Sequence, residues 1–142
     1  SRFALGTLPL QGRDEVTLDL SAFPRRIHEL VDRWAEARPE ALAVIDYDGR
    51  RSTWRDVRAA VDRAAAHLQE AGVRGGDRVL ILLENSLAAI AAIMACSRLE
   101  AWAVALNARL AGPEVDRIRA HCEPRAVVCT DAVSPDAPVD LL

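Results

Sequence analysis

Side chains able to carry catalysis are few in this sequence, and they form no complete catalytic motif. All 18 basic residues are arginines, which excludes mechanisms that need a lysine nucleophile, a Schiff base or a phosphate-loop lysine. His28, His67 and His121 each fall inside a predicted helix, without a nucleophile elbow or an H-E-x-x-H zinc motif. Asp46 and Asp48 flank a predicted turn, where aspartate is favoured for turn geometry. We therefore predict no catalytic residue in this chain.

The three cysteines do not indicate a metal site. Cys96, Cys122 and Cys129 lack the paired spacing of zinc ligands and lie among alanine, valine and isoleucine. We interpret all three as reduced, buried, small hydrophobic residues, and we predict no metal ligand.

The composition is typical of a soluble globular domain or part of one. Of the 142 residues 51% are hydrophobic, and the net charge of -3 does not favour a nucleic-acid surface. The longest strongly apolar run, residues 79–83, is too short to cross a bilayer, and the N-terminal residues do not read as a secretory signal. We expect a cytoplasmic protein with no nucleic-acid partner and no membrane span.

The first half of the chain predicts a helix, a hairpin and a second helix. Apolar residues at helical spacing predict an amphipathic helix from Pro24 to Pro39, with a stripe of Ile27, Leu30, Val31 and Trp34. Residues 41–47, an Asp-Gly turn and residues 50–52 predict a β-hairpin. The second helix begins at a capping pair, Thr53 with Asp56, and ends at Gly72.

The second half predicts alternating strands and helices. Apolar runs at 78–83, 101–106 and 125–130 are separated by two helical patterns, one capped by Asn85-Ser86 and one from Gly112-Pro113 to Pro124. The continuous apolar run at 78–83 indicates a strand covered on both faces. The predicted fold class is therefore α/β, a parallel sheet with flanking helices plus a short N-terminal β-hairpin.

Three regions are expected along the chain. Residues 1–23 mix glycine, proline and scattered apolar positions, so we treat them as an irregular N-terminal arm. Residues 24–130 form the α/β segment. Residues 131–142 are rich in proline and aspartate, as expected for a linker or a truncated end.

A parallel sheet suggests nucleotide binding, but the required glycines are missing. The strand ending at Leu83 is not followed by G-x-G-x-x-G, and a phosphate loop of the Walker type needs a lysine. A free-standing nucleotide-binding fold is therefore disfavoured.

Four ordered blocks resemble a known family. Residues 52–57 read STWRDV, similar to a T/S-Y-x-E-L block, and residues 72–79 read GVRGGDRV, similar to G-V-x-x-G-D-x-V. Residues 98–107 read RLEAWAVALN, similar to R/K-x-G-A-x-x-V-P-L-N, and residues 107–110 continue as N-x-R-L. Together the blocks resemble the adenylate-forming (AMP-binding) ligases, which include acyl-CoA synthetases, luciferases and nonribosomal-peptide adenylation domains.

Two residues depart from the family pattern. Glu100 stands where the family normally has glycine, and Ala105 stands where it normally has proline. We expect these departures to alter the turn into this strand and the exit from it.

The resemblance implies part of the N-terminal domain of an acyl-CoA synthetase-like enzyme. Such a parent enzyme would use ATP and Mg²⁺ to activate a carboxylic acid and would then transfer the acyl group to CoA. The family's Ser/Thr/Gly-rich loop ending in lysine is absent from this chain, so we expect the chain alone to be inactive. Its expected partner is the remainder of the ligase, and a homodimer stays open. The alternative is a non-catalytic α/β docking module.

One residue matches a ligand-binding position of the family. In some CoA-forming members the arginine of N-x-R-L helps to hold the nucleotide phosphate of CoA, and Arg109 occupies that position. A guanidinium after a parallel strand suits this role. The alternative interpretation is a solvated or structural arginine.

Overall fold

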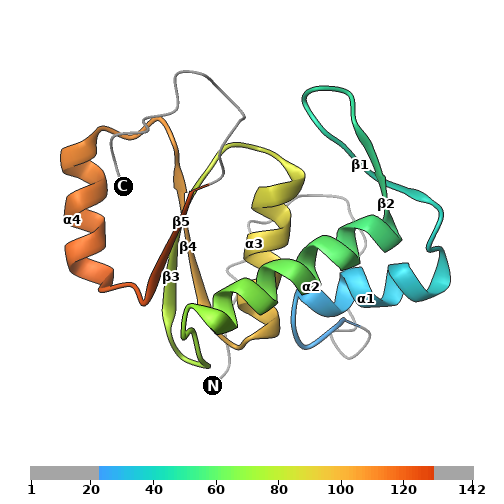
Figure 1. Ribbon diagram of the computed structural model, residues 1–142, viewed down its shortest axis with the longest axis horizontal. Coiled ribbons are helices and arrows are strands. Elements are labelled where there is room, and N and C mark those ends of the chain that lie inside the picture. Colours follow the sequence, from blue (N-terminus) through green and yellow to red (C-terminus); the bar gives the residue numbers. More distant parts are fainter. Residues whose placement is uncertain (1–22, 130–142) are drawn as a thin grey trace, which may run out of the picture.

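The computed structural model describes residues 23–129 (Figure 1). The predicted linker at 131–142, and the predicted arm at 1–23 except its last residue, lie outside the described residues. Nine elements follow one another in the order α1 (His28–Ala37), β1 (Leu42–Ile45), β2 (Arg51–Thr53), α2 (Trp54–Glu70), β3 (Arg78–Leu83), α3 (Leu87–Arg98), β4 (Trp102–Asn107), α4 (Gly112–Cys122) and β5 (Ala126–Cys129).

The parallel sheet is confirmed. Its order is β4-β3-β5, with β3 paired in parallel to both neighbours. Helices α1, α2 and α3 lie on one side of the sheet and α4 on the other (Figure 1). Successive side chains of β3 point to opposite faces of the sheet. Val79 and Ile81 pack against α2 and α3, whereas Leu80 and Leu82 pack against α4. This two-sided burial explains the continuous apolar run.

The predicted hairpin is also confirmed. Strands β1 and β2 pair antiparallel, and the turn closes through a 2.8 Å bond from the Asp46 amide to the Arg50 carbonyl. Gly49 has φ +81°, a conformation that glycine adopts without steric cost. The capping pair of α2 forms as expected, because Thr53 Oγ1 accepts from the Asp56 amide and the Asp56 carboxylate accepts from the Thr53 amide at 2.8 Å.

Helix α1 begins at His28, four residues later than Pro24. Residues 25–26 form a bend and Ile27 a turn, and the Arg25 amide donates to the Glu29 carboxylate. Within the predicted apolar stripe only Val31 is buried, and the remaining three residues are exposed.

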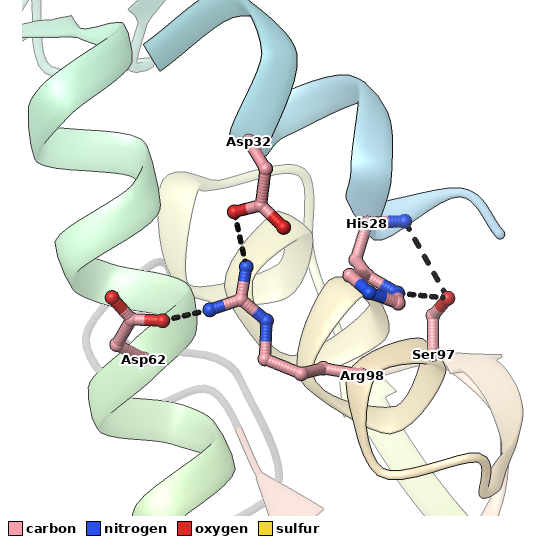
Figure 2. Close-up of polar contacts among 5 residues, drawn as sticks. All are labelled: His28, Asp32, Asp62, Ser97 and Arg98. Carbon is pink, nitrogen blue, oxygen red and sulfur yellow. Dashed lines mark hydrogen bonds and ion pairs between the residues drawn. The ribbon is translucent and has the colours of Figure 1, made fainter. Parts of the chain in front are cut away.

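Arg98, at the end of α3, links three helices (Figure 2). Its guanidinium pairs with Asp32 of α1 through one nitrogen and with Asp62 of α2 through another. Ser97, the residue before Arg98, also contacts α1. Its hydroxyl lies 3.0 Å from His28 Nδ1 and 3.4 Å from the His28 amide nitrogen. These contacts hold the start and middle of α1 on the C-terminal end of α3.

The structure shows the local backbone at both departures from the family pattern. Glu100 adopts φ +60°, a left-handed conformation that glycine adopts without steric cost. Ala105 lies within β4 in register with Ile81, and the pairing continues to Asn107 without interruption.

The cysteine interpretation needs one correction. Cys96 and Cys122 are buried as predicted, but Cys129 is exposed, because it ends a short strand at the open edge of the sheet. Burial raises the pKa of the Cys96 thiol to about 11, which makes it a poor nucleophile at neutral pH.

Candidate functional site: the carboxyl edge of the sheet

The carboxyl ends of β3 and β4 lie side by side and frame a hollow. Leu83 and Asn107, the last residues of the two strands, are register partners. The hollow has a volume of about 380 Å³ and is lined by Leu83, Glu84, Asn85, Ala105, Leu106, Asn107 and Arg109. Ligands of parallel α/β sheets bind outside the carboxyl ends of the strands, so this is where a ligand is expected.

The turn after β4 fixes the backbone of Arg109. Asn107 Oδ1 accepts a 2.9 Å bond from the Arg109 amide, and the Leu110 amide donates to the Asn107 carbonyl at 3.1 Å. The Ala108 amide bonds to the Leu83 carbonyl at 3.1 Å, which ties the turn to β3. The arginine therefore has a defined backbone while its side chain is 82% exposed.

Glu84 provides the charge partner of Arg109. Its Oε1 lies 3.7 Å from Arg109 Nε, and its side chain is only 15% exposed. An ion pair with one solvated partner contributes about 0–1 kcal/mol. A phosphate group can form charge-assisted bidentate hydrogen bonds to a guanidinium, so it can compete with this weak contact.

The N-terminus of α3, beside the same edge, is already capped. Ser86 Oγ accepts from the Ala89 amide at 3.2 Å, as the predicted Asn85-Ser86 cap requires. Asp46 Oδ2 accepts from the Leu87 amide, also at 3.2 Å. Two of the donors that a phosphate would use at a helix N-terminus are thus occupied. The sequence did not indicate the Asp46 contact, because the two residues are 41 positions apart.

Among residues 23–129 no group of three or more His, Cys, Asp and Glu side chains could hold a metal ion. His67 lies 3.6 Å from Glu70 on the same helix, and His28 contacts Ser97. In the same part of the chain, no helix is long and apolar enough to span a membrane.

The chain is thus an α/β segment with a hollow at the carboxyl edge of its parallel sheet and no glycine-rich phosphate loop after β3. The family model described as AMP-binding enzyme matches residues 31–141. The chain belongs to the AMP-binding enzyme family, and the resemblance is confirmed.

Individual relatives agree with this assignment. The chain is 32% identical over 110 residues to a fatty acid–[acyl-carrier-protein] ligase of Mycobacterium marinum, covering 77% of this chain and 21% of the relative. It is 37% identical over 79 residues to a propionate–CoA ligase of Escherichia coli, covering 52% of this chain and 13% of the relative.

A solved structure supports the fold. The N-terminal domain of FACL13 from Mycobacterium tuberculosis superposes with a TM-score of 0.70 at 30% identity, covering 73% of this chain and 26% of that one. The chain therefore spans about a quarter or less of these relatives.

Proposed function

We propose that this chain is the N-terminal segment of an ATP-dependent, AMP-forming ligase that joins a carboxylic acid to CoA. The observation that carries the proposal is Arg109, which a defined turn holds beside the hollow at the carboxyl edge. The M. marinum relative is named as a ligase of a fatty acid and acyl-carrier-protein, and the E. coli relative as a ligase of propionate and CoA. ATP and CoA are cytoplasmic substrates, so the proposal includes a cytoplasmic location.

In this proposal the chain supplies architecture and one phosphate contact. ATP and Mg²⁺ would be bound mainly by residues outside the chain, because a sequence without lysine cannot provide the family's phosphate-loop lysine. Arg109 would bind a phosphate of CoA, since a guanidinium forms short charge-assisted hydrogen bonds to phosphate oxygens. The remainder of the ligase, together with the acid substrate, would complete the active site.

An exchange assay tests whether the chain acts alone. The isolated chain, incubated with ATP, Mg²⁺, labelled pyrophosphate and a panel of carboxylic acids, should give no exchange above a no-protein control. Measurable exchange with any acid would contradict the proposal that this chain alone does not catalyse adenylation. A docking module, the alternative function, also gives no exchange, so a second assay is needed.

The second assay replaces Arg109 with alanine in the complete ligase. Loss of one charge-assisted hydrogen bond, about 1.5 kcal/mol, corresponds to a KM for CoA raised about tenfold. The adenylation half-reaction should be unaffected. With pantetheine, which lacks the nucleotide phosphates, variant and wild type should have equal KM values. Arg117→Ala, which removes an exposed arginine of α4, is the matched control. An unchanged KM for CoA in Arg109→Ala would rule out the assignment.

A further inference from the structure

Helix α1 has a wide apolar surface, of which only one side is buried. Val31 and Ala35 are 3% and 5% exposed and face the other helices. Ile27, Leu30 and Trp34 are 48%, 42% and 41% exposed. A surface helix normally directs its apolar residues to the core alone, and adjoining exposed apolar residues mark an interaction site. These three side chains therefore keep about two-fifths or more of their surface exposed.

This exposed side is concave. A hollow of about 410 Å³, here called the α1 groove, is lined by Phe23, Pro24, Leu30, Arg33, Trp34 and Ala37. One wall is fixed, because the Trp34 ring stacks on Trp54 with centroids 5.9 Å apart and an interplanar angle of 19°. The Arg38 guanidinium lies 5.5 Å from the same ring. A groove with a preorganised aromatic wall can accept apolar side chains with little loss of side-chain entropy.

We propose that residues 16–20 of this same chain dock in the α1 groove. Continuity favours this occupant, because Phe23 and Pro24 follow the segment almost directly and already line the groove. A tethered segment binds at a high effective concentration, whereas a separate molecule must overcome the entropy of association.

The apolar pattern of the segment matches the groove. Val16, Leu18 and Leu20 alternate with Thr17 and Asp19, so in an extended conformation they share one face with a spacing of about 6.6 Å. Four residues along a helix rise about 6 Å, which is the separation between Leu30 and Trp34. An extended segment beside α1 can therefore place successive apolar side chains against successive residues of the exposed stripe.

The charges are complementary as well. Residues 14–20 carry three acidic side chains, Asp14, Glu15 and Asp19, and Arg13 precedes them. Among the described residues that line the groove, the charged one is Arg33. Opposite charges around an apolar contact favour this arrangement over docking of a basic segment.

Site-specific photocross-linking tests the proposal on the full chain. We would replace Ala37, an exposed residue of the groove, with p-benzoylphenylalanine, and place the same probe at Arg117 of α4 as the control. The expected product is an intramolecular link from position 37 to residues 14–20, at least ten times more abundant than from position 117. A link between two molecules would show that a second copy fills the groove. That result, or no enrichment over the control, would overturn the proposal.

Matched variants in the Ala37 probe background test the apolar pattern. Leu18→Asp with Leu20→Asp should reduce the intramolecular link at least tenfold. Thr17→Asp with Ser21→Asp adds the same charge at the polar positions and should change it less than twofold. Circular dichroism verifies that both proteins remain folded. Equal losses in the two variants would contradict the proposal. The readout needs no ligase activity, so it is independent of the proposed function.

Discussion

Arg26 Nη2 lies 2.9 Å from Glu100 Oε1, which joins the segment before α1 to the turn that enters β4. The backbone of Glu100 has φ +60°. This left-handed conformation costs a residue with a Cβ about 1–2 kcal/mol. Both side chains are substantially exposed, 44% and 64%, so the ion pair contributes only about 0–1 kcal/mol. The turn therefore retains strain that the ion pair does not fully offset.

Glu100→Gly should consequently stabilise the chain. Glycine adopts positive φ freely, and the expected gain in the free energy of unfolding is about 1 kcal/mol, reduced by the loss of the ion pair. Urea unfolding followed by circular dichroism measures this change. Arg26→Ala removes the same ion pair without relieving the backbone, so it should be neutral or slightly destabilising. If Glu100→Gly were no more stable than Arg26→Ala, the strain argument would fail.

Arg98→Met should destabilise the helical layer. The substitution keeps most of the aliphatic volume but leaves Asp32 and Asp62 without the guanidinium that links them. The Arg98 side chain is 24% exposed, so we expect a loss of about 2 kcal/mol, less than for a fully buried pair. Arg63→Met, an exposed substitution on α2, is the control and should change stability by less than about 0.5 kcal/mol. Similar losses in both variants would mean that the bridge contributes nothing specific.

The capping box of α2 predicts a specific pH dependence. Hydrogen bonds from the Thr53 amide and hydroxyl hold the pKa of the Asp56 carboxyl below its ordinary value of 3.8. Because the folded-state pKa is the lower one, the stabilisation is fully present above the unfolded-state value and is lost as the pH falls through the folded-state value.

Asp56→Asn should therefore make the free energy of unfolding less dependent on pH in the acid range. Between about pH 5 and pH 2 the free energy of unfolding of the variant should fall less steeply than that of the wild type. Asp48, whose pKa is lowered mainly by hydrogen bonds from Arg50, retains part of the slope in both proteins. Chemical unfolding at a series of pH values measures the difference. Identical slopes for the two proteins would exclude Asp56 as a contributor.

Features with local signals were predictable from the sequence. The capping pair lies within one helical turn, and the β3 run is apolar at every position after Arg78. The contacts of Arg98 with Asp32 and Asp62 were not predictable, since the partners are 66 and 36 positions away and no local pattern relates them. The start of α1 was misplaced because Pro24 fits a first helical turn but the structure forms a bend and a turn there.

In the candidate site, too, some features could be predicted from the sequence and others could not. Arg109 could be placed at the carboxyl edge, because it follows the end of a predicted parallel strand. Its pairing with Glu84 could not, because that pairing depends on the register of β3 with β4. The strand order itself, β4-β3-β5, needs tertiary packing to be known.

Glu84→Gln should strengthen the phosphate binding that we propose for Arg109. The carboxylate at 3.7 Å competes with an incoming phosphate for the guanidinium, and glutamine keeps the size of the side chain while removing the charge. In the complete ligase the KM for CoA should fall about two- to fivefold, which corresponds to the weak attraction of an ion pair with one solvated partner. The same substitution in an Arg109→Ala background should not change the KM for CoA, because the guanidinium for which Glu84 and the phosphate compete is missing. A higher KM in the single variant would instead make Glu84 a positioning residue that orients Arg109 toward the ligand.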